Sequence, residues 1–329
     1  MNILGISCFY HDAAAALVCD GQLVAAVQEE RFTRKKHDQN FPRHAVQFCL
    51  EYARLKPEQL DFIVFYDKPF TKFDRILQTY IATFPRGLTS FLKAMPVWIK
   101  EKIWIPQMIR KDLPYDGQIL FTDHHMSHAA SAFLVSPFEE AAILTIDGVG
   151  EWDTTTYGFG KQNDIRLMKC IEFPHSLGLF YSAFTYYLGF RVNSAEYKVM
   201  GLAPFGEPRF YDLIMKELVT LLADGSFRLN MQYFTYERGL RMTGKKFSKL
   251  FGEPVREPES KLTQFHKDVA ASLQKATDTI MVAMARHVER ESKIRSRTCL
   301  FSRRRVMRVA LWARRSTHTI RFWVTSARL

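Results

Sequence analysis

The segment GISCFYHDAAAALVCDGQLVAAVQEERFTRKKHDQNFPRHA, residues 5–45, decides how this chain folds. Three apolar runs at residues 2–8, 13–19 and 23–27 predict consecutive β-strands, and Asp20-Gly21 is a favoured type I′ hairpin dipeptide. A tight turn then joins the first two strands and carries His11 and Asp12. These two side chains either hydrogen-bond the backbone of their own turn or face a ligand.

The rest of the chain alternates β and α patterns, which indicates an α/β protein. Apolar spacing predicts strands at 60–66, 119–122 and 141–147, a second hairpin at 155–159 and 166–170, helices at 43–54, 124–134, 178–188 and 263–291, and two amphipathic helices between 71 and 111. The second hairpin repeats the pattern of the first. We therefore expect two lobes of one kind, the first over residues 1–150 and the second, incomplete, over 151–291.

The segment TDHHMSHAASAF, residues 122–133, joins metal-ligating side chains to a helical pattern. His124 and His128 are four residues apart, so they project from one face of the predicted helix, as two imidazole ligands of one divalent ion do. Asp147 ends the apolar strand AAILTID and is the natural carboxylate partner. A histidine pair at this spacing is also an ordinary surface or capping feature, and both interpretations stay open at this level.

Glycines follow this strand. Gly148 and Gly150 allow backbone amides to approach phosphate oxygens, because a residue without a Cβ permits close contact. Together with the histidine pair, they predict a metal and phosphate site at the end of the strand.

The amino-acid sequences of these segments resemble those of a known family. FYHDAAAALVCDG, VAAVQEERFTRKKHDQNFP and HHMSHAASAF are similar to the ATP-dependent O-carbamoyltransferases of the nodulation protein U and cephalosporin and tobramycin carbamoyltransferase type. The resemblance implies the fold of actin, sugar kinases and heat-shock ATPases, which is ribonuclease H-like. In that fold the turn between the first two strands approaches the phosphates of a nucleotide.

The resemblance also implies a reaction in two steps. Carbamoyl phosphate reacts with ATP to give carbamoyl-adenylate and pyrophosphate, and a hydroxyl of a sugar, antibiotic or lipo-oligosaccharide then attacks the carbamoyl carbon. ATP and carbamoyl phosphate are the implied co-substrates. The implied cofactor is a divalent metal, Fe2+ or similar, held by His124, His128 and Asp147.

Several polar residues match positions of the family's site. His11 is the candidate general base for the acceptor hydroxyl, because imidazole can take that proton near neutral pH. Asp12 is a candidate nucleotide contact. Lys36 is the candidate for a phosphate or carbamoyl oxygen, with a solvated charge run as the alternative. In NSAEYKVMGLAPFG, Glu196 and Lys198 are candidates for nucleotide or carbamoyl contacts, with a surface ion pair as the alternative.

The net charge of +12 and the pI near 9.4 come from one end of the chain. Residues 292–329 hold 11 basic and no acidic side chains, which leaves 35 basic and 34 acidic side chains in residues 1–291. Small molecules, not nucleic acids, are therefore the expected partners, and a homo-oligomer stays open. Scattered cysteines, the lack of a signal-peptide pattern and the lack of a membrane-length apolar run indicate a cytoplasmic protein.

The tail itself, residues 292–329, fits no helix, strand or linker pattern and resembles translation in a wrong frame. Residues 300–314 can be encoded by codons that, when translated from a start two bases later, give the sequence IQPAAGDAGGALGA. That sequence is similar to a glycine-rich motif of the family. In the family the aspartate of this motif is a fourth metal ligand, and here its codon would straddle Val306 and Met307. We therefore expect a disordered tail and a chain truncated after about Glu291. The alternatives are an inactive remnant of the enzyme and a tail that binds nucleic acid.

Overall fold

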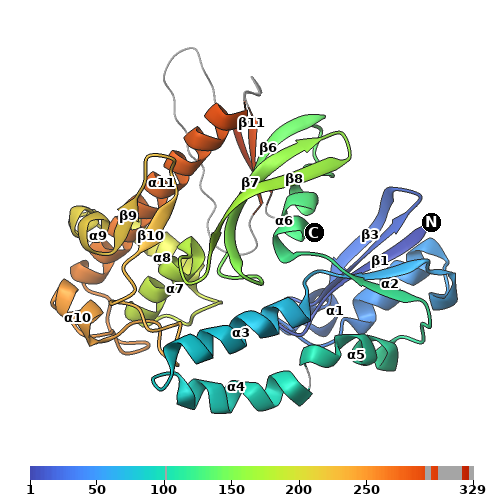
Figure 1. Cartoon of the computed structure of the whole chain (residues 1–329), viewed down its shortest axis with the longest axis horizontal. Helices are drawn as coiled ribbons and strands as arrows, with labels where there is room; N and C mark the ends of the chain where they lie inside the picture. Colours follow the sequence, from blue (N-terminus) through green and yellow to red (C-terminus); the bar gives the residue numbers. More distant parts are fainter. Residues whose placement is uncertain (101, 293–297, 303–320, 326–329) are drawn as a thin grey trace. The chain divides into compact units, whose positions relative to one another are not determined.

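The computed structural model describes residues 1–100, 102–292, 298–302 and 321–325, and the chain divides into two compact units (Figure 1). The first unit contains residues 1–77 and 91–127. The second contains residues 78–90 and the described residues from 128 onward. Each unit is built around one five-stranded sheet. The second unit begins before residue 150, because the strand at 140–146 pairs in the second sheet.

The sheet of the first unit has the strand order β3-β2-β1-β4-β5. Its strands are β1 (Asn2–Ser7), β2 (Ala14–Cys19), β3 (Gln22–Gln28), β4 (Phe62–Phe65) and β5 (Gln118–Phe121). The first three strands are antiparallel, whereas β4 and β5 run parallel to β1. Asp20 (φ 49°) and Gly21 (φ 80°) both have the positive φ that a type I′ turn requires, so the predicted hairpin is confirmed.

Helix α2 (Arg43–Ala53) covers the core of this sheet with its buried face. The other helices of this part of the chain are α1 (Glu30–Thr33), η1 (Pro57–Gln59), α3 (Pro69–Thr83), α4 (Leu88–Lys100), η2 (Lys102–Trp104) and α5 (Ile105–Asp112). The sequence predicts two helices between 71 and 111, and the structure has three α-helices there. The third is separate because Pro106 starts a new helix in its first turn.

The sheet of the second unit repeats the topology of the first. Its strands are β6 (Glu140–Ile146), β7 (Asp153–Lys161), β8 (Asp164–Glu172), β11 (Thr298–Ser302) and β12 (Arg321–Thr325), in the order β12-β11-β6-β7-β8. Three antiparallel strands are followed by two parallel ones, as in the first sheet. Two sheets of this order characterise the ribonuclease H-like fold of actin and sugar kinases, so the predicted fold class is confirmed.

Strands β11 and β12 lie within residues 292–329, where the sequence analysis expected none. That expectation is wrong for these two segments. Their sequences, TCLFS and RFWVT, are rich in the aromatic and β-branched residues that favour strands, but arginine blocks beside them hide the apolar pattern. The rest of the tail, including Val306 and Met307 with the expected fourth ligand, lies outside the described residues.

Helix α11 (Gln264–Ser292) supports the second unit along its length. Its buried residues recur every three or four positions and pack against α7 (Leu177–Tyr187), α8 (Glu196–Leu202) and α9 (Tyr211–Glu217). Helix α6 (His124–Phe133) packs on β6. The unit also contains η3 (Ala203–Phe205), β9 (Val219–Leu221), β10 (Phe227–Leu229) and α10 (Lys245–Phe251).

Asp268 ties the segment after η3 to α11. This carboxylate is buried and accepts hydrogen bonds from the Glu207 amide (2.8 Å) and the Gln264 side chain (2.9 Å), and it pairs with Arg209. Burial by itself raises the pKa of Asp268, but these donors outweigh it and hold that pKa below its usual range. The backbone at Gly206 lies so close to α11 that an added Cβ would be 2.1 Å from the Lys267 carbonyl oxygen.

No helix among the described residues combines the length and hydropathy needed to span a membrane. Cys8, Cys19, Cys49 and Cys170 are free thiols.

We expect Gly206→Ala to lower the free energy of unfolding by about 1–3 kcal/mol, because the backbone of α11 must move to admit the methyl group. Gly201→Ala is the matched control. An added Cβ at this helical glycine contacts nothing within 4 Å, so stability should rise by about 0.4–1 kcal/mol. Urea denaturation followed by circular dichroism measures both, and equal effects would contradict the packing described.

Asp268→Asn should destabilise the protein by about 1–3 kcal/mol at pH 7 through loss of charge-assisted hydrogen bonds. The depressed pKa means that this contribution is present above the unfolded pKa of about 4 and is lost as pH falls through the folded value. The difference between wild type and variant should therefore shrink in acid. Asp212→Asn, at an exposed position in α9, is the control; a pH-independent difference would refute the assignment.

Candidate functional site

Helix α6 presents His124 and His128 one turn apart. Both imidazoles are buried, and the next turns of the helix, through Ala129 and Phe133, pack on β6. Phe133 lies over Gly160 of β7, where an added Cβ would be 2.5 Å from its ring. The helix is therefore fixed on the second sheet, and the histidine side chains have little freedom.

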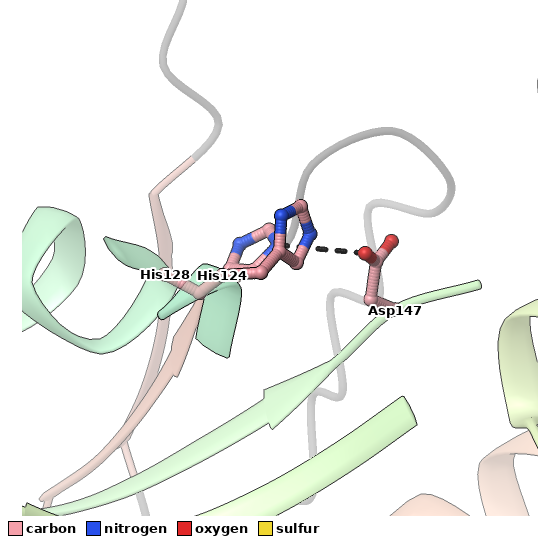
Figure 2. A group of neighbouring side chains, drawn as sticks. All are labelled: His124, His128 and Asp147. Atoms are coloured by element: carbon pink, nitrogen blue, oxygen red, sulfur yellow. Dashed lines mark ion pairs between the residues drawn. The ribbon is translucent and has the colours of Figure 1, made fainter. Parts of the chain in front are cut away.

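Asp147 follows β6 and faces this helix. Its Oδ2 lies 3.6 Å from Nε2 of His128, and one ligand atom from each of His124, His128 and Asp147 lies within 4.8 Å of the others (Figure 2). The side chain of Asp147 is 20% exposed, so the cluster is open on one side. The structure thus brings together the three residues that the sequence predicts as metal ligands.

The donor set fits a divalent transition ion. Two imidazole nitrogens and one carboxylate oxygen form the ligand set of non-haem iron sites and of many zinc sites, with positions left for water or substrate. Mutual spacing below 4.8 Å lets one ion reach all three with small side-chain adjustments.

The start of α7 fixes the backbone of the Asp147 loop. Ser176 caps this helix by accepting a hydrogen bond from the Leu179 amide (2.9 Å), and its hydroxyl also lies 3.1 Å from the Asp147 carbonyl and 2.6 Å from that of Gly148. An added Cβ at Gly178 would be 2.6 Å from the Asp147 carbonyl oxygen. A serine before a predicted helix and a glycine in its first turn are the sequence signals that point to Ser176 and Gly178.

The two predicted phosphate-contacting glycines differ. Gly148 has space at its Cα, where the nearest neighbour of an added Cβ is Leu179 Cδ2 at 3.9 Å. The amide of Gly150 instead donates to the Asp153 carbonyl (3.2 Å) within the turn. The Cα of Gly148 is therefore open, whereas the Gly150 amide already has a partner within the turn, and the phosphate contact of both glycines stays a prediction.

The turn between β1 and β2 holds a second polar cluster, within the first unit. Asp12 (φ 47°) accepts one hydrogen bond from each of two imidazoles, with Oδ2 3.1 Å from Nδ1 of His11 and Oδ1 3.1 Å from Nδ1 of His37. Glu30 accepts the backbone N–H of His37 (3.1 Å). Sequence reasoning named His11 and Asp12 but missed His37 and Glu30, because their proximity depends on residues 38 and 39 folding back onto the turn between β1 and β2, where they bond the Ala13 and Phe9 amides.

Lys36 does not join this cluster. Its side chain is exposed and makes no hydrogen bond or ion pair in the described part of the chain, while its neighbour His37 reaches Asp12. Lys36 is thus a free cation beside the turn, consistent with either the phosphate contact or the solvated charge run that the sequence left open.

Glu196 and Lys198 have different environments. Glu196 is buried at the start of α8, where Oε1 accepts hydrogen bonds from the Ser182 hydroxyl (3.0 Å) and the Asn193 amide (2.7 Å). Lys198 is exposed two residues later. The alternative of a surface ion pair between them does not hold, because Glu196 faces the core of the second unit.

Comparison with solved structures gives low global scores. The ROK hexokinase of Thermus thermophilus aligns with a TM-score of 0.36 and 13% identity over 92% of this chain and 81% of that chain. The Ppx/GppA phosphatase of Aquifex aeolicus aligns with a TM-score of 0.31 and 11% identity over 88% and 93%. The fold assignment rests on the strand order of the two sheets and not on these scores.

Curated relatives match more closely in sequence. The uncharacterized protein sll1178 of Synechocystis is 55% identical over 298 residues, which are 88% of this chain and 48% of that protein. The nodulation protein NolNO of Sinorhizobium fredii is 34% identical over 284 residues, 85% of this chain and 38% of that protein. The chain therefore spans about half the length of these relatives, or less.

A protein-family model described as the carbamoyltransferase N-terminus matches residues 2–301. The match extends past residue 291, where the sequence analysis ended the resemblance, and reaches into β11. It includes the three candidate metal ligands and the polar cluster in the turn between β1 and β2. The chain therefore belongs to the family of the carbamoyltransferase N-terminus.

Proposed function

We propose that this chain is the metal- and nucleotide-binding part of an ATP-dependent O-carbamoyltransferase. The observation that carries the proposal is the cluster of His124, His128 and Asp147 in a chain that matches the carbamoyltransferase family over residues 2–301. The proposed acceptor is a hydroxyl of a sugar, antibiotic or lipo-oligosaccharide. This acceptor class rests on the resemblance of the sequence motifs to the O-carbamoyltransferases.

The proposed reaction balances in two steps. Carbamoyl phosphate, ATP and one water give carbamoyl-adenylate, inorganic phosphate and pyrophosphate. The acceptor oxygen then forms a bond to the carbamoyl carbon, the bond to the adenylate oxygen breaks, and AMP leaves with its electron pair. A bound divalent ion supplies positive charge that offsets the charge on the phosphates.

His11 is proposed to take the proton of the acceptor hydroxyl. Asp12 at 3.1 Å holds Nδ1 as the protonated nitrogen, which leaves Nε2 as the basic atom. The side chain of His11 is 27% exposed, so a substrate can reach it. An imidazole oriented by a carboxylate is the usual arrangement of a general base that must present a single nitrogen.

The remaining predicted contacts keep distinct roles. Lys36 is proposed to bind a phosphate or carbamoyl oxygen, since its ammonium group has no partner in the described residues. Asp12, Gly148, Gly150 and Lys198 stay predicted nucleotide contacts. Glu196 is proposed to act indirectly: its hydrogen bond from the Asn193 amide shapes the loop before α8.

The inactive remnant and the nucleic-acid-binding tail are the other functions that the sequence raised. Neither gains support from the structure, because the predicted ligands converge and most of the basic tail lies outside the described residues. Activity therefore decides between enzyme and remnant.

Metal content tests the proposed centre. The purified full chain should bind about one divalent ion, and His128→Ala and Asp147→Asn should each weaken Co2+ or Fe2+ binding by about 10-fold or more, because each removes one of three ligands. Asp123→Asn is the control, since this carboxylate is exposed beside the same helix and pairs with Lys68. Metal analysis and Co2+ titration measure the effect; equal binding by Asp147→Asn and wild type would exclude the site.

Exchange of labelled pyrophosphate into ATP tests the first step. Exchange by the wild-type chain should require carbamoyl phosphate, and Lys36→Gln should slow it by about tenfold or more through loss of a charge-assisted contact. Lys35→Gln is the matched control: this adjacent lysine lies 3.9 Å from Asp38.

His11→Gln should leave the exchange within about twofold of wild type, because the base acts only on the acceptor hydroxyl in the second step. Loss of exchange in this variant would contradict the proposed role of His11. Absence of exchange in the wild-type chain would favour the inactive remnant.

A further inference from the structure

The second unit contains a basic pocket built from residues other than the candidate metal ligands. It has a volume of about 520 Å³ and is formed by the segment at 86–90 together with the loop and helix at 235–248. This volume lies within the range of small-molecule sites, about 300–1,000 Å³. Every lining residue belongs to the second unit.

Four cations line the pocket, and its lining residues include no acidic side chain. The cations are Arg86, Arg238, Arg241 and Lys245. The nearest acid in sequence, Glu237, lies 3.6 Å from Arg238 and can offset one of these charges. The remaining positive charge favours an anionic occupant, because like charges gathered in one concave surface repel one another until a counter-charge binds.

Hydrogen-bond donors accompany the charges. Thr89 and Ser90 line the pocket from the first turn of α4, whose backbone N–H groups have no partners within the helix. Thr243 also lines it, and its Oγ1 is buried without a hydrogen-bond partner in the described part of the chain. A buried hydroxyl in this state is rare and indicates a missing partner.

The frame of the pocket is held by the backbone. The Thr235 amide donates to Met242 (3.1 Å), and the Gly244 amide donates to Tyr233 (3.3 Å), so residues 233–244 form a closed loop. The Ser90 hydroxyl reaches the Arg238 carbonyl (3.5 Å), which joins this loop to the start of α4. These hydrogen bonds therefore hold the backbone that carries the cations in place without a ligand.

The geometry points to a binding site for a small phosphorylated molecule in this pocket. Clustered guanidinium groups match phosphate oxygens through paired hydrogen bonds, and threonine and serine hydroxyls supply additional donors. The site goes beyond the proposed transfer reaction, whose predicted residues include none of those lining the pocket.

Binding of pyrophosphate to the full chain tests this inference. The measurement is isothermal titration calorimetry at about 0.15 M salt, where screening suppresses distant charges. All proteins carry Asp147→Asn and are free of metal, so that binding at the candidate metal site does not contribute. Lys245→Gln and Arg241→Gln should each weaken binding by about tenfold or more, because each removes a charge-assisted contact.

Lys246→Gln is the matched control. Lys246 is the next residue of α10, is exposed, and bonds Gln232 (3.1 Å) instead of lining the pocket. It should change binding by less than about twofold, because screening limits distant charges. Equal losses in Lys245→Gln and Lys246→Gln, or no binding of pyrophosphate by the parent protein, would overturn the site. Inorganic phosphate, carbamoyl phosphate and ATP, titrated in turn, identify which phosphate-bearing group binds most tightly.

Lysine acetylation followed by mass spectrometry supplies a readout that needs no pocket variant. Pyrophosphate should protect Lys245 and leave Lys246 unchanged, and the opposite pattern would refute the proposal. The result is independent of the proposed enzyme function, since pyrophosphate exchange can fail while this protection persists.

Discussion

The close approach of α7 to the end of β6 is the constraint on which the candidate site depends. Gly178 leaves room for the backbone of Asp147, and the Ser176 hydroxyl contacts the carbonyls of Asp147 and Gly148. The same contact starts α7 and directs the carboxylate of Asp147 toward His128 on α6 (Figure 2). A larger residue at 178 would separate the helix from the strand and displace Asp147, a candidate metal ligand.

The part of the fold that local patterns specify could be predicted. Asp20-Gly21 fixed the first hairpin, and the spacing of His124 and His128 placed both imidazoles on one helix face. Strands β11 and β12 could not be found in this way, because each is short and is recognised as a strand only through its pairing with a distant segment. Local apolar periodicity carries no information on such long-range pairing.

The same distinction applies to the candidate site. The three candidate metal ligands stand in recognisable local patterns, a histidine pair at helical spacing and an aspartate at the end of an apolar strand, so the sequence could name all three; their role as ligands stays a prediction. His37 and Glu30 reach the turn only because residues 38 and 39 fold back onto it, and the buried hydroxyl of Thr243 without a hydrogen-bond partner is a property of the folded loop. Glu196 was expected to contact a ligand, but its side chain is buried. The sequence could not reveal this, because a glutamate that follows turn residues gives the same local pattern whether its carboxylate is exposed or buried.

The carboxylate shared by His11 and His37 has a consequence for the geometry of the turn. Each oxygen of Asp12 bonds Nδ1 of one imidazole, so a single side chain sets the orientation of both rings. His37 lies 25 residues beyond Asp12 in the sequence, and the same carboxylate therefore links the turn to a distant segment of the chain. The candidate base and that segment depend on one residue, and loss of the Asp12 side chain would release both rings together.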